Sequence, residues 1–433
     1  MEQGKRIYAE GEKVEYKKLT LAEHIKALGP GIVFVLTAMG AGDIVDSSVS
    51  GSHYGYALMW VLAVAILVRF VIVNIMARFD MCNTEGITLL QGYGRLHKAF
   101  PWFFIIFSLF CGHMTNATMI SGSGNALYNL TGVGNVFIWA CIAVAASFFV
   151  AGKNIQRYLE NIMKVLLALM TIAFLALAIM AKPDPVEIFK GIFTFEMPAG
   201  MGLFSATTIM LALIGSVAGS MTNFLYPHSI RAKGWTDPTW KKVQRGDLLF
   251  SIIMMIVINL AVWIVGAEVL AKNGIEVQTL DDLAAGMEIT FGRAGSVLLY
   301  LGVFGAVYSS VLGVASGWGA VVIESYQVVH PERLEKYGSA EADPLYKFAS
   351  LFLLITPVVW SLPGMPDFVA LAVIHNVITA LGLPAIAIGL LFLATNKKLM
   401  GRFHNNIAEN IILLFTVILA CWSAIKIVIG FFA

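Results

Sequence analysis

Charged residues are scarce in this chain. Only 13% of its 433 residues are Asp, Glu, Lys or Arg, against about 25% in a typical soluble protein, and 58% are hydrophobic. The mean hydropathy of +0.79 indicates that most of the chain faces lipid. The formal net charge is +2 and no basic cluster stands out, so no nucleic-acid partner is predicted. This composition is typical of an integral membrane protein.

Cysteine is scarce as well. The four cysteines lie far apart, mostly in apolar runs, and none has the spacing of a disulfide framework or a metal cluster: Cys82, Cys111, Cys141 and Cys421. We interpret them as small hydrophobic core residues. A histidine cluster, a glycine-rich phosphate loop and a Ser/His/Asp set at membrane depth are missing too. We therefore predict neither an enzyme nor a cofactor.

Long apolar runs are what the chain has instead. A membrane helix needs roughly 17–25 apolar residues, and by that measure we predict eleven spans: 29–51, 57–77, 101–124, 134–152, 159–181, 201–227, 247–270, 294–323, 345–362, 368–396 and 409–431. The polar segment Met1–Lys26 is not a cleavable signal sequence. The loops 182–200, 271–292 and 327–344 are too short for a soluble domain. The fold class is therefore an all-α integral membrane protein.

Lysine and arginine are distributed unevenly between the loops. They gather before span 1 and after spans 2, 4, 6, 8 and 10, for example at Lys5, Arg6, Arg78, Arg95, Lys153, Arg157, Arg231, Lys233, Arg333, Lys336, Lys397 and Lys398. The loops 52–56, 125–133 and 363–367 have none. Because basic residues stay on the cytoplasmic side, we predict a multi-pass protein of the cell membrane with a cytoplasmic N-terminus and an extracytoplasmic C-terminus.

The spans fall into two sets of five. Because five is odd, the second set enters the membrane from the opposite side, as in an inverted repeat. We therefore divide the chain into a cytoplasmic tail (1–28), a first repeat (29–181), an inverted second repeat (201–396) and an eleventh helix (409–431) outside the repeat.

The first span of each set is interrupted by glycine and polar residues. Span 1 contains Met39-Gly40-Ala41-Gly42-Asp43-Ile44-Val45-Asp46, and span 6 contains Gly215-Ser216-Val217-Ala218-Gly219-Ser220-Met221-Thr222-Asn223. Unwound backbone at this depth is tolerated only inside protein or beside a cavity. A pair of such breaks in corresponding positions is typical of a transporter's substrate site. We therefore predict a secondary transporter that binds its substrate between broken helices 1 and 6.

Charged side chains lie close to these breaks. Asp43 and Asp46 place carboxylates in an apolar span, and Arg69 places a guanidinium near the middle of span 2. Because an unpaired charge is unfavourable in lipid, we expect Arg69 to pair with Asp46 or Asp43. Two other roles are open for Arg69: it could replace a coupling ion, or it could bind an anionic substrate.

Uncharged groups could complete a site. A thioether such as that of Met221 favours a soft or borderline divalent ion, whereas oxygen ligands alone suit magnesium or calcium. Asn376 in span 10 could supply an amide oxygen, and its neighbour His375 is typical of an interior histidine. His228 closes span 6 on the predicted cytoplasmic side.

Motifs along nearly the whole chain resemble the NRAMP family of divalent metal transporters. They are Gly29-Pro30-Gly31 in span 1, Leu58-Met59-Trp60-Val61-Leu62 in span 2, Ala126-Leu127 with Gly132 after span 3, Leu225-Tyr226 with His228-Ser229 at the end of span 6, and Leu383-Pro384 with Thr395-Asn396-Lys397-Lys398-Leu399-Met400-Gly401 in and after span 10. The resemblance implies a LeuT-type fold with ion binding between spans 1 and 6.

The chain departs from this family at the site itself. The family's Asp-Pro-Gly-Asn motif aligns with Gly40-Ala41-Gly42-Asp43, so Asp43 stands where the family has its ligand asparagine. Met221 matches the family's ligand methionine, Ala218 its carbonyl donor, and Asn376 its span-10 glutamine. The positions that the family uses for proton transfer hold residues that cannot carry protons: Asn116, Met119 and Asn223.

Residues and resemblance together predict a secondary active transporter of a divalent metal cation, either of the manganese and iron class or of the magnesium class. It would work by alternating access with weak or absent proton coupling. The predicted ligands are Asp43, Met221, Ala218, Gly40 and Asn376, and the predicted charge partners or coupling residues are Arg69, Asp46, His228 and His375. The metal ion is the substrate, the bilayer is the other partner, and a monomer is compatible with the sequence.

A second possibility stays open at this point. The same scaffold could carry a small anion or a polar solute, with Arg69 as a substrate ligand and helix N-termini assisting.

Overall fold

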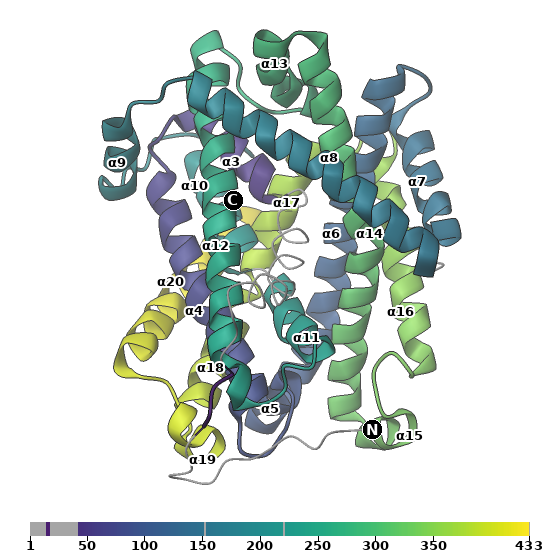
Figure 1. The fold of residues 1–433 in the computed structure, drawn as a ribbon, viewed down its shortest axis with the longest axis vertical. Coiled ribbons are helices and arrows are strands. Elements are labelled where there is room, and N and C mark those ends of the chain that lie inside the picture. Colours follow the sequence, from purple (N-terminus) through teal and green to yellow (C-terminus); the bar gives the residue numbers. More distant parts are fainter. Residues whose placement is uncertain (1–13, 18–41, 151–152, 220, 433) are drawn as a thin grey trace.

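The computed structural model describes residues 14–17, 42–150, 153–219 and 221–432, and in these ranges every regular element is a helix (Figure 1). The α-helices are α3 (Gly42–Tyr54), α4 (Met59–Cys82), α5 (Leu89–Leu96), α6 (Ala99–Thr131), α7 (Val136–Val150), α8 (Lys153–Met180), α9 (Pro185–Phe193), α10 (Ala206–Leu213), α11 (Leu225–Ala232), α12 (Lys241–Ile264), α13 (Leu280–Phe291), α14 (Arg293–Val329), α15 (Pro331–Tyr337), α16 (Pro344–Ile355), α17 (Phe368–Ala380), α18 (Leu383–Thr395), α19 (Lys397–Met400) and α20 (Ile407–Phe432). Short π- or 3₁₀-helical turns join or extend them: η1 (Ile214–Ala218), η2 (Met221–Phe224), η3 (Pro238–Trp240), η4 (Val265–Leu270), η5 (Ala271–Asn273), η6 (Thr356–Ser361) and η7 (Gly401–Phe403).

Several of these helices, alone or joined to a neighbouring element, are long enough to cross a membrane. Among the described residues, eight helices have the necessary length and apolar composition. A ninth candidate is the pair Val165–Met180 and Pro185–Phe193, which is bent by 106°, and Val136–Phe148 is a shorter apolar helix. Each predicted span from 57–77 onward coincides with one or two helices of the structure. The predicted all-α membrane architecture is therefore confirmed.

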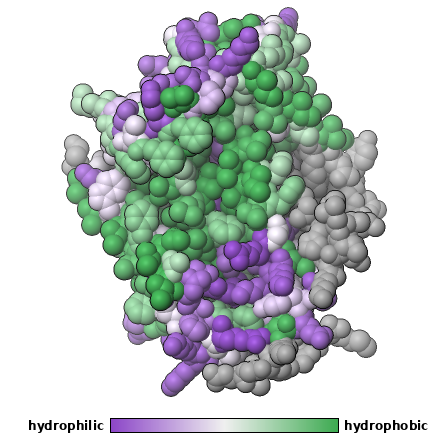
Figure 2. Space-filling model, turned by 60° about the vertical axis from the view of Figure 1, so that its left-hand side comes forward, coloured by the Kyte–Doolittle hydropathy of each residue, from purple (hydrophilic) through white to green (hydrophobic). Residues whose placement is uncertain are grey.

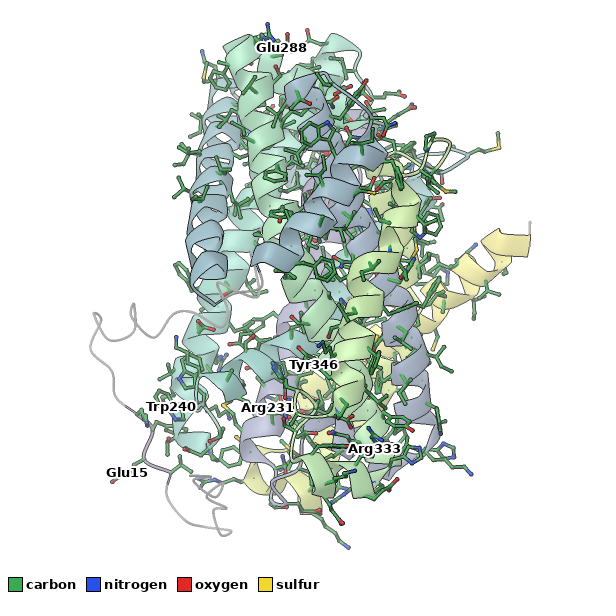
Figure 3. The ribbon with its side chains drawn as sticks, turned by 90° about the vertical axis from the view of Figure 1, so that its right-hand side faces the viewer. Glu15, Arg231, Trp240, Glu288, Arg333 and Tyr346 are labelled. Carbon is green, nitrogen blue, oxygen red and sulfur yellow. The ribbon has the colours of Figure 1, made fainter. Side chains whose placement is uncertain are left out.

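The surface separates into an apolar middle and polar ends. Figure 2 shows a hydrophobic belt between hydrophilic regions at the top and the bottom of the molecule. In Figure 3, Glu288 lies at one end, whereas Arg231 and Arg333 lie toward the other. Since a bilayer solvates apolar surface and polar residues remain in water, this distribution fits a protein that crosses the membrane.

Loops that were expected on the same side of the membrane contact one another. Thr84, after α4, donates its backbone N–H to the carbonyl of Leu399 in the basic loop after α18 (2.8 Å). At the opposite end Asn125 donates to the Asp367 carboxylate (2.8 Å), and both residues lie in loops or helix ends without Lys or Arg. The alternation of basic and non-basic loops is thus matched by two ends of the molecule.

Local capping sets several helix starts at these ends. Thr88 and Gln91 form a capping box at the start of α5, and Thr279 and Asp282 form another at α13. Asp343 caps α16, whose first residue is a proline. These short polar signals end the loops, while burial of apolar side chains holds the long helices together.

Helices α3 and α12 approach each other closely where α12 continues into η4. A Cβ at Gly51 of α3 would overlap with the carbonyl oxygen of Trp263, and one at Gly266 would lie 2.8 Å from the carbonyl oxygen of Ser48. Small residues at crossing points let membrane helices approach this closely. The contact fixes α3, which carries the two candidate carboxylates, against the second half of the bundle.

Helix α20 packs on the outside of the bundle, against α4 and α18 (Figures 1 and 3). Arg78 of α4 ties its start in place, since its guanidinium donates to both carboxylate oxygens of Glu409 (2.8 and 3.0 Å) and to Asn405. Ile411, Ile418 and Ile425 on α20 are exposed, as lipid-facing residues are.

Candidate functional site

The predicted break in span 6 is present as a change of helix type. Regular α-helix ends at Leu213, a π-helical turn follows over η1, and the chain resumes after Gly219 as the 3₁₀ turn η2 and then α11. Gly219 donates its N–H to the carbonyl of Ile214 (2.7 Å), five residues back. Such turns leave backbone groups outside the α-helical pattern, where they can meet a ligand. In span 1, Gly42 opens α3, and Gly40 lies outside the described residues.

Helix α17 lies directly against this break (Figure 1). A Cβ at Gly215 would overlap with the carbonyl oxygen of Asn376, and the hydroxyl of Thr379 donates to that same oxygen (2.7 Å). Glycine at position 215 therefore permits the close approach that brings the side chain of Asn376 to the start of α3.

Asp46 is the centre of a buried polar cluster. Its Oδ2 accepts a hydrogen bond from Ser216 Oγ (2.7 Å) and another from Asn376 Nδ2 (2.9 Å). Asp46 is 0% exposed and Asn376 is 2% exposed. The cluster joins α3, η1 and α17, which are far apart in sequence.

Asp43, one turn earlier on α3, faces a different partner. Its Oδ2 lies 3.7 Å from Nη1 of Arg69 on α4, and both side chains are fully buried. Of the two partners expected for Arg69, the structure therefore pairs it with Asp43. Arg69 Nη1 also lies 3.4 Å from the sulfur of Met255 on α12. Next to this pair, Ser47 donates to Asn259 of α12 (2.7 Å).

The predicted span-6 ligands lie just beyond the π-helical turn. Met221 is buried in η2, and Ala218 ends η1. The carbonyl of Ala218 accepts a hydrogen bond from Asn223 Nδ2 (3.1 Å). Asn223 therefore satisfies the backbone at the break.

The span-3 positions and His375 serve packing and hydrogen bonding. Asn116 donates to the carbonyl of Leu353 (2.7 Å), and Met119 is buried on α6. Nε2 of His375 lies 2.8 Å from the hydroxyl of Thr115, so this histidine is directed toward α6.

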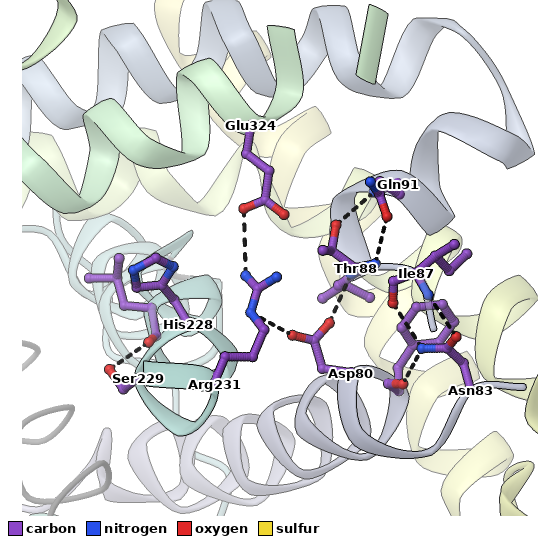
Figure 4. A network of polar contacts seen from close by, with 12 residues as sticks. Asp80, Asn83, Ile87, Thr88, Gln91, His228, Ser229, Arg231 and Glu324 are labelled. Atoms are coloured by element: carbon purple, nitrogen blue, oxygen red, sulfur yellow. Dashed lines mark hydrogen bonds and ion pairs between the residues drawn. The ribbon is translucent and has the colours of Figure 1, made fainter. Parts of the chain in front are cut away.

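His228 belongs to a separate polar region at the end of the molecule that carries Arg231 (Figure 4). Arg231 of α11 links two helices, since its Nε lies 3.1 Å from Asp80 of α4 and its Nη2 lies 3.5 Å from Glu324 of α14. His228 lies 3.7 Å from Glu341. His228, Arg231, Glu324 and Glu341 all border a cavity of about 390 Å³. Among the described residues, the lining of that cavity includes no residue of α3 or η1.

Ser216 and Asn259 were not among the residues predicted from sequence. Ser216 lies within the interrupted segment, and Asn259 is a polar residue inside an apolar run of α12, so each carried a local signal. In the described part of the chain, no group of three or more His, Cys, Asp or Glu side chains could hold a metal ion. An ion held here would therefore need mixed ligands, such as carboxylate, hydroxyl and amide oxygens.

The chain is similar to known proteins over most of its length. Residues 31–430 match the family model described as Natural resistance-associated macrophage protein-like. The chain is 26% identical to the divalent metal cation transporter MntH of Bacillus subtilis over 396 residues, which cover 87% of this chain and 86% of the relative. It is 24% identical to MntH of Deinococcus radiodurans over 387 residues, which cover 86% and 83%.

Solved structures show the same fold. The Eremococcus coleocola manganese transporter is similar with a TM-score of 0.77 at 19% identity, over 97% of this chain and 90% of that one. MhsT, solved in complex with L-phenylalanine, is similar with a TM-score of 0.54 at 15% identity, over 92% and 97%. These likenesses confirm the predicted LeuT-type fold. Because the family model covers nearly the whole length, the chain belongs to the Natural resistance-associated macrophage protein-like (Nramp) family, whose members are transporters and not enzymes.

Proposed function

We propose that this protein is a secondary active transporter of a divalent metal cation. It works by alternating access, with the N-terminus in the cytoplasm and the C-terminus outside. Membership of a family with divalent metal transporters supports the substrate class. The basic loops at one end of the molecule support the orientation.

One observation carries the proposal. Two carboxylates, Asp43 and Asp46, are buried at the start of α3 beside the interrupted span, and Arg69 is the cation that faces one of them. Carboxylates inside a membrane are energetically unfavourable, and those that occur there mark binding or transport sites. A site with more negative than positive charge is suited to a cation.

The proposed ligands are Asp43, Met221, Ala218 and Asn376, together with Gly40, which lies outside the described residues. The polar cluster at Asp46 and the burial of Met221 support a site in this region. Oxygen ligands suit magnesium, calcium and manganese, whereas a thioether such as that of Met221 favours a soft or borderline divalent ion over magnesium.

Weak or absent proton coupling is part of the proposal. Asn116, Met119 and Asn223 have no ionisable group, and Asn116 and Asn223 are engaged with backbone carbonyls. His375 is hydrogen-bonded to Thr115, on the side of α17 that faces α6. A proton relay through these residues therefore lacks its carriers.

The rival function, transport of a small anion or polar solute, would use Arg69 as a ligand. The Arg69 guanidinium already faces Asp43, which leaves less positive charge to attract an anion. We therefore favour the cation.

Uptake into liposomes tests both the proposed transport of a divalent cation and the rival transport of an anion or polar solute. Purified full-length protein should accumulate Mn²⁺ or Mg²⁺ without acidifying the lumen, and the Asp43→Ala variant should transport less. Movement of an anion that divalent ions do not inhibit, lost in Arg69→Ala, would favour the rival. The proposal would be wrong if the purified protein moved no divalent ion and if Asp43→Ala left metal binding, measured by calorimetry, unchanged.

A further inference from the structure

Among the residues that the structure describes, the buried charges around α3 do not balance. Asp43, Asp46 and Arg69 are 1%, 0% and 0% exposed. Arg69 lies 3.7 Å from Asp43, and among the described residues no cationic side chain lies within ion-pair distance of Asp46. With both carboxylates ionised, two negative charges face one positive charge. The uncompensated charge is the one on Asp46.

The two oxygens of Asp46 have different surroundings. Oδ2 accepts hydrogen bonds from Ser216 and Asn376, whereas Oδ1 has no hydrogen-bond partner among the described residues. A buried polar atom without a partner calls for an explanation, and a bound ion is one. Oδ1 is therefore a free carboxylate oxygen at a site with excess negative charge.

Two further oxygens adjoin this carboxylate. Asn376 donates through Nδ2, so its Oδ1 is not used in any hydrogen bond within the described part of the chain. Ser216 Oγ donates to Asp46 and retains lone pairs. A Cβ at Gly42 would lie 3.0 Å from both amide atoms of Asn376, so the backbone of α3 leaves just enough room for this amide.

This inference rests on the proposed function. We infer that Asp46 supplies the net charge that holds the transported cation, and that Ser216 and Asn376 supply further oxygen ligands to that cation. Asp43 is a secondary ligand whose charge Arg69 already balances. Carboxylate, hydroxyl and amide oxygens form a hard donor set. This part of the site therefore selects Mg²⁺ and Mn²⁺ over the softer Cd²⁺.

Calorimetric titration of the purified full-length protein with MnCl₂ and MgCl₂ tests the inference. Asp46→Asn removes the charge and keeps the shape, and it should weaken binding of both ions by about 100-fold or more, because a divalent ion loses contact with a full charge. Asp43→Asn should weaken binding by less than about 10-fold, because Oδ2 of Asp43 is directed to Arg69 and the inferred ion makes its closest contact with Asp46. Asp367→Asn is the matched control, because Asp367 caps α17 at its distant end and Asn also caps helices; its affinity should equal that of the wild type.

Three outcomes separate the possibilities. If the wild type binds neither ion, the proposed function itself fails. If the wild type binds and Asp46→Asn binds equally well, or loses no more affinity than Asp43→Asn, the inference is wrong and the proposed function stands. Should Asp46→Asn not fold, Ser216→Ala decides instead: about a 10-fold loss supports the inference, and wild-type affinity overturns it. Ser123→Ala is the control for Ser216→Ala, because Ser123 is a buried serine of α6 whose hydroxyl donates to the carbonyl of Met119 in the same helix. Its affinity should equal that of the wild type.

Discussion

Arg69 and Asp43 form an ion pair between α4 and α3 inside the bundle, with 3.7 Å between Nη1 and Oδ2. Removal of one partner from a buried pair leaves the other charge uncompensated, which typically destabilises a protein by about 3–5 kcal/mol. The pair therefore links the stability of the bundle to the proposed ion binding.

We predict that Arg69→Gln lowers the thermal stability of the ion-free protein and raises its affinity for a divalent cation. The lost positive charge leaves two carboxylates that a divalent ion can neutralise. Fluorescence-detected melting with and without Mn²⁺ checks this, since the ion should raise the midpoint more in the variant than in the wild type. Arg95→Gln, which affects an exposed pair with Glu85, should do neither. Loss of the Mn²⁺ effect in Arg69→Gln would identify Arg69 as a substrate ligand.

A second prediction concerns the contact between Gly215 and α17. Gly215→Ala places a methyl group on the carbonyl of Asn376, so we expect a loss of about 1–3 kcal/mol and impaired transport. Gly246→Ala is the matched control, because a Cβ there meets nothing within 4 Å, and alanine stabilises a helix relative to glycine. Equal melting temperatures and equal uptake rates for the two variants would contradict the close packing.

A third prediction concerns Met221. Met221→Leu keeps the volume of the side chain and removes its sulfur, so the protein should fold while uptake of Cd²⁺ falls relative to uptake of Mg²⁺. Competition between the two ions in liposomes measures the ratio. Met119→Leu, also buried but on α6, should leave the ratio as it is. An equal fall in the uptake of both ions in Met221→Leu would indicate that Met221 serves packing.

A fourth prediction follows from the loop before α16. Arg333 donates to both carboxylate oxygens of Asp343 (2.6 and 2.9 Å), which holds the pKa of Asp343 below its ordinary value. The stabilisation is complete above the ordinary pKa of 3.8 and is lost as pH falls through the lower folded value. Asp343→Asn should therefore lower the free energy of unfolding at pH 6 by on the order of 1 kcal/mol, and the variant should melt at a lower temperature than the wild type. The difference from the wild type should shrink toward pH 3, and a constant difference would assign the effect to packing.

The apolar runs predicted the helices well because the bilayer imposes a minimum length on each span. Short helices inside the loops were not predicted. Segment 182–200 contains α9, and 271–292 contains α13. Both have readable starts, with Asp184 before Pro185 and the Thr279 capping box, but neither helix is long enough to appear in a search for spans.

For the candidate site, the sequence named residues but not the contacts between them. Asp43 and Asp46 lie three residues apart and share one side of a helix, so the sequence could not decide which of them faces Arg69. That choice depends on how α4 packs against α3. The bonds of Asp46 to Ser216 and Asn376 likewise depend on contacts across about 170 and 330 positions, which local patterns do not encode.

The Arg69–Asp43 pair also bears on the response of the carrier to voltage. With both carboxylates ionised, the trio of Asp43, Asp46 and Arg69 has one excess negative charge, and a divalent ion bound as proposed would turn this into one excess positive charge. In the proposed carrier, an electric field negative inside would thus drive the loaded form inward and the empty form outward, each by about 2.3 kcal/mol per 100 mV if the charge crosses the whole field. Without the guanidinium, a loaded carrier would be electrically silent, and only its return would feel the field.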